Sequence, residues 1–286
     1  MKSIPMSSPN WPPLDIGQFT GQGGRKYNED RYMLIESGRF VLAVVADGAG
    51  GQGGGDVAAQ IVVDNIAKDF RRWLAAGPHE SLPSSVLTRL LASANEAVRE
   101  GQERGGVCAK MCSTAVLLGI DRERREAVFG NCGDSRLYLL REGRALPITR
   151  DHSLVQKLID HGMLQPEDAQ RHPQRNALFA ALGSDETVEF HVPRDGFALR
   201  QGDWLFLCSD GFWDYLPNEY LAETAAKAHS AQDWLETLAR QVESVAPENH
   251  DNYTAIAIAL GKPYIAPPAQ HEAQASQDLL FEAFGI

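Results

Sequence analysis

The stretch Thr114–Ile148, TAVLLGIDRERREAVFGNCGDSRLYLLREGRALPI, contains four apolar runs separated by short polar segments. Runs of this length, bounded by Asp, Asn, Gly and charged residues, are typical of strands joined by turns. Strands are predicted at Thr114–Ile120, Arg125–Asn131, Arg136–Arg141 and Ala145–Ile148. Because the connections are too short for a crossover helix, we expect neighbouring strands to pair antiparallel.

The sequence on either side of this stretch adds helices and further strands. Phe40–Ala46 is a continuous apolar run that predicts a buried strand, and two helical patterns follow it, from about Asp56 and about Ser84. Further helices are expected over 151–161, 217–229 and 231–244, and further strands over Trp204–Cys208 and Tyr253–Leu260. Two successive helices followed by a run of strands do not form the alternation of a parallel sheet. The order predicts an α+β fold, with antiparallel sheets and helices packed outside them.

Composition excludes several classes of function. The 286 residues are 43% hydrophobic and carry a net charge of −11, from 27 basic and 38 acidic side chains. An acidic chain without a basic run is a poor binder of nucleic acid or of an anionic membrane. The longest aliphatic runs are too short to span a bilayer, and the start of the chain lacks the apolar core of a secretory signal. The expected location is therefore the cytoplasm.

One domain is the expected organisation. Residues 1–14 are rich in Pro and Ser and are predicted to be a flexible N-terminus, whereas 15–261 contain no stretch that resembles a linker. Residues 262–286 are predicted to form a C-terminal tail. The four cysteines include no CxxC pair, so we interpret them as reduced, small packing residues and not as a disulfide framework.

Three aspartates adjoin predicted strands. Asp47 follows FVLAVVA, Asp210 follows WLFLCS, and Asp251 precedes Asn252 and the run YTAIAIAL. A single aspartate at a strand end is usually a turn or cap residue. Three of them are better explained by convergence on a cation, because carboxylates that lie together repel one another. A ligand set of oxygen atoms, without His or Cys, favours magnesium, manganese or calcium over zinc.

A charged segment, GGRKYNEDR at 23–31, is a further candidate. By itself it is compatible with a solvated turn. Beside a carboxylate–metal site, Glu29 or Asp30 offers another oxygen ligand, and the guanidinium of Arg25 offers a planar fork to a phosphate dianion.

The glycine-rich loop Gly48–Gly53 allows a different interpretation. It satisfies GxGxxG between a predicted strand and a predicted helix, and Asp69 follows about twenty residues later, as in a dinucleotide-binding site. Two features oppose this function: Asp47 would face the pyrophosphate, and the element after the helix is another helix. The glycines are also compatible with a tight strand-to-helix turn that has no ligand of its own.

Seven motifs occur in the order found in type 2C (PPM-family) protein phosphatases, especially the bacterial members. They are GGRKYNEDR, VVADGAGG, MCSTAV, GNCGDSRLYLLR, ITRDHSLV, LCSDGFWDYL and HDNYTAIAI, and the resemblance covers about residues 16–261. The resemblance implies a central antiparallel β-sandwich flanked by helix pairs. It also implies hydrolysis of phosphoserine and phosphothreonine in proteins by a water that bridges two manganese or magnesium ions.

The resemblance also assigns roles to residues. Asp47 would bridge the two metals, Asp210 and Asp251 would serve one of them, and Glu29 and the Gly48 carbonyl would serve the other. Arg25 would bind the phosphate. Behind these groups, Asp30 and Asn252 would orient ligands or waters, and Asp134 and His152 are interpreted as structural or orienting residues. The flap region of the family would correspond to 154–185.

Two departures from the family pattern affect the expected chemistry. Ala109 stands where many members have an aspartate that binds a third metal, so a third ion is expected to be weak. Ala49 stands where eukaryotic members often have a proton-donating histidine, so solvent is expected to protonate the leaving group. His161 and His172 in the flap region are the alternative donors to test. The expected partners are phosphorylated proteins and a Ser/Thr kinase, and the chain is expected to be a monomer. The alternative from another class is an inactive module that binds phosphoproteins.

Overall fold

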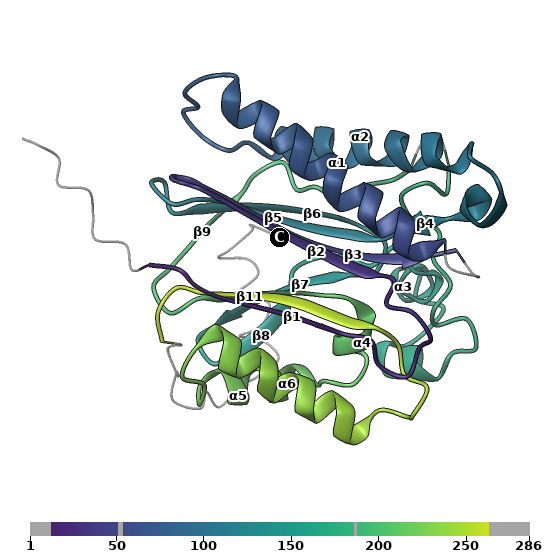
Figure 1. The fold of residues 1–286 in the computed structure, drawn as a ribbon. Coiled ribbons are helices and arrows are strands. Elements are labelled where there is room, and N and C mark those ends of the chain that lie inside the picture. The colour runs from purple at the N-terminus through teal and green to yellow at the C-terminus, as the bar shows by residue number, and fades with distance from the viewer. Residues whose placement is uncertain (1–12, 51–53, 186–187, 263–286) are drawn as a thin grey trace, which may run out of the picture.

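Two antiparallel sheets form the centre of the protein in the computed structural model, which describes residues 13–50, 54–185 and 188–262 (Figure 1). The first sheet has the order β1-β11-β10-β7-β8, with bounds Asp15–Gly21, Tyr253–Ala259, Trp204–Cys208, Arg136–Arg141 and Arg144–Pro147. The second has the order β2-β3-β5-β6-β9, with bounds Asp30–Ser37, Phe40–Ala49, Ala115–Asp121, Glu126–Cys132 and Phe197–Ala198. The short strand β4, Cys112–Ser113, pairs with the end of β3.

Helices cover the outer face of each sheet and complete four layers. The second sheet is covered by α1, Gly55–Ala75, and α2, Ser84–Gln102 (Figure 1). The first is covered by α5, Asn218–Ala225, and α6, Ala231–Val245, with the single turn α4, Asp210–Trp213, at the end of β10. Short 3₁₀ turns lie at Gly106–Lys110, named η1, and Pro166–Arg171, named η2. The arrangement confirms the predicted α+β sandwich.

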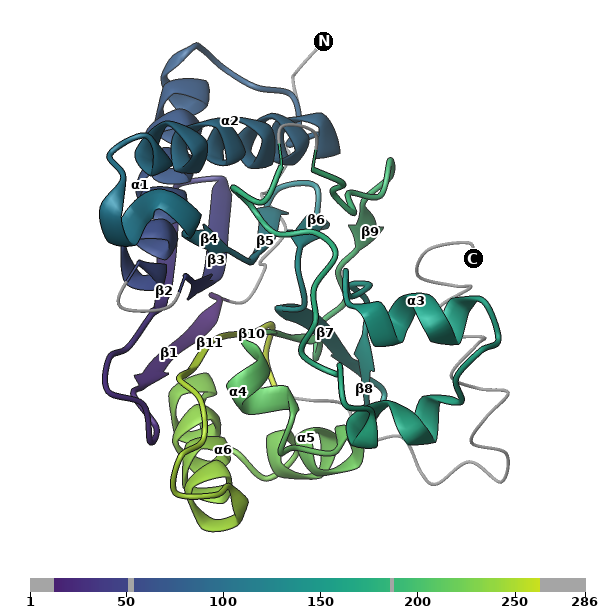
Figure 2. The same cartoon turned by 90° about the vertical axis from the view of Figure 1, so that its right-hand side faces the viewer.

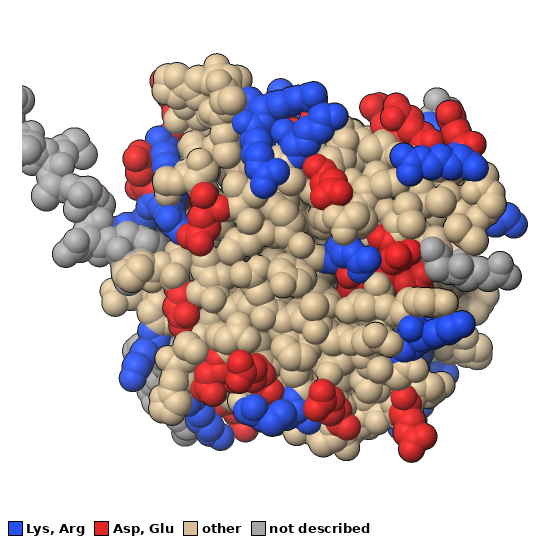
Figure 3. All heavy atoms as spheres, in the orientation of Figure 1, with Lys and Arg blue, Asp and Glu red and all other residues tan. Residues whose placement is uncertain are grey.

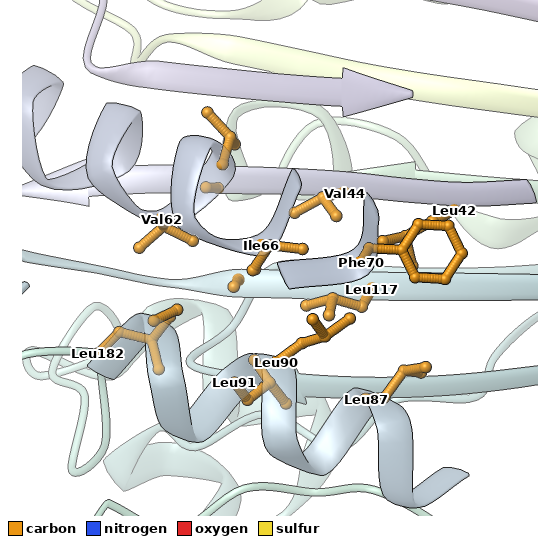
Figure 4. Close-up of a cluster of buried hydrophobic side chains, with 14 of the residues drawn as sticks. Leu42, Val44, Val62, Ile66, Phe70, Leu87, Leu90, Leu91, Leu117 and Leu182 are labelled. Carbon is orange, nitrogen blue, oxygen red and sulfur yellow. The ribbon is translucent and has the colours of Figure 1, made fainter. Parts of the chain in front are cut away.

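Strand β3 shows why its sequence is apolar without alternation. Val41, Ala43 and Val45 belong to the core between the two sheets, where they pack with residues such as Leu205 and Ile256. The residues between them, including Leu42 and Val44, belong to the core under α1 and α2 (Figure 4). Since both faces of the strand are buried, both sets of side chains are hydrophobic.

The predicted elements agree with the structure apart from some of their ends. The helix expected over 151–161 is shorter: α3 spans Leu154–Asp160, because the Ser153 side chain caps its first turn by accepting a hydrogen bond from the Gln156 backbone N–H. The helix expected over 217–229 ends at Ala225. Most of the terminal segments 1–14 and 262–286 lie outside the described residues, so their predicted flexibility stays a prediction.

Strands β1 and β2 had no counterpart among the sequence-based strand predictions. Both lie at the edges of their sheets and are only partly buried. The sequence of β1, DIGQFTG, lacks a continuous apolar run, and that of β2, DRYMLIES, has only the short run 32–35 after charged residues. The charged segment before β2 is therefore a turn that leads directly into a strand. This edge strand carries Asp30 as its first residue.

Charge is distributed without one dominant sign on the face drawn in Figure 3, where basic and acidic side chains are interspersed.

Among the described helices, none is both long and apolar enough to cross a membrane.

A buried ion pair joins the last residue of β7, Arg141, to the residue before β10, Asp203. This ion pair leads to a prediction about stability. The guanidinium of Arg141 donates to both carboxylate oxygens of Asp203, at 2.8 and 2.7 Å, and the two side chains are 4% and 1% exposed. Asp203→Ala leaves a buried cation unpaired, so we expect a loss of about 3–5 kcal/mol in the free energy of unfolding, measured with urea. The exposed pair of Arg124 with Glu126 is the control, because Glu126→Ala should cost less than about 1 kcal/mol. Equal effects of the two substitutions would contradict this assignment.

Candidate active site

The candidate site begins where β2 and β3 pair. Their register places Asp30 directly opposite Asp47. The backbone of Asp47 is held on its other side, because its N–H donates to the Thr114 hydroxyl at 3.1 Å and its carbonyl accepts from the Thr114 N–H at 2.8 Å. Asp47 therefore lies inside β3, not beyond its end as the sequence suggested, and two strands fix its position.

The other sheet contributes through the adjacent ends of β10 and β11. Asp210 is the first residue of α4, immediately after β10, and Asp251 lies two residues before β11. Gly211 allows these ends to approach, since a Cβ on it would lie 2.0 Å from the Asn252 carbonyl oxygen. The antiparallel pairing of β10 with β11 thus brings Asp210 and Asp251 to the same end of the sheet.

Buried hydrogen bonds join the two sheets at this end. The Ser209 hydroxyl donates to Asp30 Oδ2 at 2.7 Å and accepts from the Thr254 N–H at 3.0 Å. The Asn252 side chain accepts from the Glu29 N–H at 2.8 Å. Asp30 and Asn252 therefore connect the strand that carries Asp47 with the strand ends that carry the other aspartates.

Glu29 and Gly48 both contact the first residue of α1, Gly55. The backbone N–H of Gly55 donates to Glu29 Oε1 at 3.1 Å, and the Gly48 N–H donates to the Glu29 carbonyl at 3.2 Å. A Cβ on Gly48 would lie only 1.9 Å from the Gly55 carbonyl oxygen, so a glycine is required for this close approach.

Arg25 is positioned by the glycines before it. Gly23 has a positive φ of 60°, and the Gly24 N–H donates to the His250 carbonyl at 3.0 Å. The Arg25 guanidinium is 2.5 Å from Asp251 Oδ2, and its side chain is 53% exposed. The cation therefore stands at the surface, beside one of the aspartates and free to contact a ligand.

A pocket of about 190 Å³ opens beside Arg25, and Asp47, Glu29 and Gly48 are not among its lining residues. Its volume is below the ~300 Å³ at which drug-sized sites begin, so it fits a small charged group. Arg25, Asp210 and Asp251 line it, together with residues that the sequence did not single out, namely Arg175, Asp214 and His250. His161 and His172, named above as alternative proton donors, are not among its lining residues.

Burial and mutual repulsion dominate the electrostatics of the carboxylates. The pKa of Asp47 is raised well above its usual value by burial and by the charges of Asp30 and Asp210. Burial likewise raises the pKa of Asp210, and Asp134 is the largest charged contributor to that shift. The pKa of Asp30 rises to about 6, mainly through burial.

These carboxylates have the chemistry of ligands for a hard cation. Oδ1 of Asp30 and Oδ1 of Asp210 are buried without a hydrogen-bond partner. Within the described ranges, no three His, Cys, Asp or Glu side chains are already gathered tightly enough to enclose an ion, and Asp251 is paired with Arg25 instead. A divalent cation would relieve both the repulsion and the unsatisfied oxygens, so the donor set fits magnesium or manganese.

Asp134, which the sequence analysis interpreted as a structural or orienting residue, is a further buried carboxylate near the site. It is 7% exposed, and burial together with the charge of Asp151 raises its pKa to about 7. The contribution of its charge to the pKa of Asp210 shows that the two groups interact. In the sequence, the GDSR motif was the signal that marks Asp134 as a candidate. His152, by contrast, accepts a hydrogen bond from the Gly133 N–H at 3.0 Å and so holds the turn before Asp134.

The dinucleotide-binding interpretation finds no support. All strand pairs of the described residues are antiparallel, and α1 is followed by α2, so the βαβ unit that such a site requires is missing from the described part of the chain. Of the glycine-rich loop, residues 51–53 lie outside the described residues.

Comparison with known proteins identifies the family. The sequence profile described as Protein phosphatase 2C matches residues 24–253. The serine/threonine phosphatase stp of Listeria innocua is 29% identical over 238 residues, which are 82% of this chain and 90% of that protein. PstP of Mycobacterium tuberculosis is 34% identical over 206 residues, 70% of this chain but only 36% of that longer protein.

Solved structures agree with this result. Stp1 of Staphylococcus aureus superposes with a TM-score of 0.76 at 25% identity, covering 91% of this chain and 99% of that one. The catalytic domain of PstP in complex with two manganese ions has a TM-score of 0.68 at 27% identity, covering 86% and 97%.

The chain belongs to the protein phosphatase 2C family. The predicted resemblance and the predicted activity, metal-dependent dephosphorylation of serine and threonine in proteins, are thereby confirmed. None of the relatives favours the inactive binding module.

The raised carboxylate pKa values predict the stability of the metal-free protein. The pKa of Asp210 is higher in the folded state than in the unfolded chain, so its contribution to stability is greatest below about pH 4. That contribution is lost as the pH rises through the folded-state pKa. In chelator at pH 7.5, Asp210→Asn should therefore raise the melting temperature relative to the unmodified chain, and the difference should shrink towards pH 5. The exposed Asp64→Asn on α1 is the control. A lower melting temperature for Asp210→Asn at pH 7.5 would refute the proposed charge repulsion.

Proposed function

We propose that phosphate hydrolysis takes place in the pocket lined by Arg25, Asp210 and Asp251 and that it uses two manganese or magnesium ions. One observation carries this proposal. Arg25, whose guanidinium is a type of cation that binds phosphate, lies in one small pocket with Asp210 and Asp251, whose carboxylates repel each other. The two manganese ions in the related PstP catalytic domain support the ion count.

Five groups are proposed as metal ligands. Asp47 would serve both ions, Asp210 and Asp251 would serve one, and Glu29 and the Gly48 carbonyl would serve the other. The half-buried position of Asp47 on β3, where the charges of Asp30 and Asp210 both raise its pKa, supports its central role. The Glu29–Gly48 backbone hydrogen bond supports their assignment to a common ion.

The bound ions would supply an activated water and a positive charge for the phosphate oxygens. The chain's own groups position the reactants. Arg25 is paired with Asp251 and would donate to the phosphate when Asp251 serves as a metal ligand. Asn252 holds the Glu29 backbone, and Ser209 holds one oxygen of Asp30 and leaves the other, Oδ1, buried without a hydrogen-bond partner.

A third ion and a proton donor are separate questions. Ala109 is exposed on η1 and offers no oxygen side chain, which supports weak binding of a third ion. Asp134 is a buried carboxylate that interacts with Asp210, and it would be the ligand to test for such an ion. At the end of β3, Ala49 provides no proton, and solvent is the proposed donor to the leaving group.

The proposed setting is a cytoplasmic monomer that acts on phosphorylated proteins and opposes a Ser/Thr kinase. The acidic composition and the names of the bacterial relatives support this proposal. Residues 263–286 lie outside the described residues, and the proposal assigns them no catalytic role.

The first activity prediction concerns Asp47. An amide cannot neutralise two cations, so Asp47→Asn should reduce kcat on p-nitrophenyl phosphate by at least about 10²-fold at any manganese concentration. The circular dichroism spectrum should be unchanged, because the backbone hydrogen bonds with Thr114 remain. Recovery of normal turnover at saturating manganese would exclude a bridging role for Asp47.

The second activity prediction concerns Arg25. Losing one charge-assisted contact to phosphate costs about 1.5–3 kcal/mol, so Arg25→Ala should lower kcat/KM on a phosphothreonine peptide by roughly 10- to 150-fold. The affinity for manganese should change little. Lys26→Ala is the matched control, because Lys26 lies over the Tyr27 ring and does not line the pocket. Equal kinetics of the two variants would remove Arg25 from the phosphate site.

A further inference from the structure

A second cavity, of about 490 Å³, adjoins the pocket of the candidate active site. The two share the lining residues Arg175, Asn176 and Asp214. A ligand that places one group beside Arg25 can therefore extend into the second cavity without leaving the protein surface. We call this space the flank cavity.

Residues of α3, of η2 and of the start of α5 line the flank cavity. Figure 2 shows where α3, α4 and α5 lie. The walls of the cavity include apolar side chains, namely Val155 and Ile159 of α3, Trp213 of α4 and Leu216. Such walls fit the methylene stem of a long side chain.

The basic residues of the flank cavity are already paired. The Arg136 guanidinium is 2.7 Å from Asp151 and stacks on the Trp213 ring with 3.6 Å to its centroid. The Arg175 guanidinium is 2.9 Å from Asp214. Neither cation is available to an acidic ligand without breaking an ion pair.

Three acidic side chains of the lining remain. Asp134 is 7% exposed, and no other described residue donates a hydrogen bond to its carboxylate. Glu167 on η2 and Glu219 on α5 are exposed lining residues and have no ion pair within the described part of the chain. The flank cavity thus combines apolar walls with an excess of negative charge.

We propose that the flank cavity binds a lysine or arginine side chain that flanks the phosphorylated residue of the substrate protein. The stem of such a side chain would lie along Val155 and Ile159, with its cationic group near Glu167 and Glu219. This inference rests on the proposed function, because the phosphate beside Arg25 defines where the flanking residue begins. It defines a class of substrate, phosphoproteins with a basic residue near the phosphate, and it makes Glu167 and Glu219 specificity-determining residues.

The test measures kcat/KM on a set of phosphothreonine peptides. One lysine is placed in turn at each of the four positions on either side of the phosphothreonine, in an otherwise neutral background, and each peptide is compared with its alanine and glutamate versions. The enzymes are the full chain, Glu167→Gln, Glu219→Gln and the double variant. Glu223→Gln is the matched control, because this exposed glutamate belongs to the same helix as Glu219 and does not line the flank cavity.

At one or two peptide positions, we expect kcat/KM of the full chain to be higher with lysine than with alanine, by about two- to fivefold for each of Glu167 and Glu219 that contacts the lysine. Glutamate at the same positions should lower kcat/KM. The double variant should lose that preference, whereas Glu223→Gln should keep it. Activity on p-nitrophenyl phosphate, which is too small to reach the flank cavity, should be the same in all five enzymes.

Failure of this inference and failure of the proposed function give different results. Normal hydrolysis of p-nitrophenyl phosphate with no lysine preference at any position, or with a preference that survives in the double variant, would overturn the inference alone. No hydrolysis of any phosphate ester by the full chain with manganese would overturn both.

Discussion

The repulsion between carboxylates at the junction of the two sheets is the constraint on which the site depends. Asp47 comes from β3 of one sheet, between β2 and β5, and Asp210 and Asp251 come from strand ends of the other. Only a rigid scaffold can hold such groups together against their charges. The hydrophobic cores on the two faces of β3 supply that rigidity, since β3 is buried on both faces and cannot move away from its neighbours.

Close backbone contacts at two glycines bring the segments that carry the site residues together. Gly48 lets the end of β3 approach the start of α1, and Gly211 lets α4 approach the residues before β11. Any Cβ at either position would occupy space already filled by backbone atoms. The glycines of the DG pairs are thus explained by packing, and the aspartates before them by charge.

The sequence was sufficient to predict the layered fold, because apolar runs are local signals. Strand-end aspartates are local signals too, and they singled out Asp47, Asp210 and Asp251 as candidate metal ligands, a role that stays a prediction. The sequence was not sufficient for β1 and β2, whose edge positions leave them half exposed and without a clear pattern. It also missed the interaction of Asp134 with Asp210, since the two are brought together only by tertiary structure. Arg175 and Asp214 form an ion pair across 39 positions of sequence, a contact that no periodicity could indicate.

Binding a phosphate dianion to a chain of net charge −11 requires local reversal of that charge. Arg25 and the divalent cations held by the carboxylates can provide this within a few ångströms, where screening by salt is weak. Farther away, the unpaired acidic side chains of the flank cavity repel a ligand that carries only negative charge. A basic residue beside the phosphate removes this penalty, because the phosphate then meets the cations while the basic side chain meets the carboxylates. The acidic side chains of the flank cavity would therefore select among phosphoproteins, and this selectivity is separable from the chemistry in the neighbouring pocket.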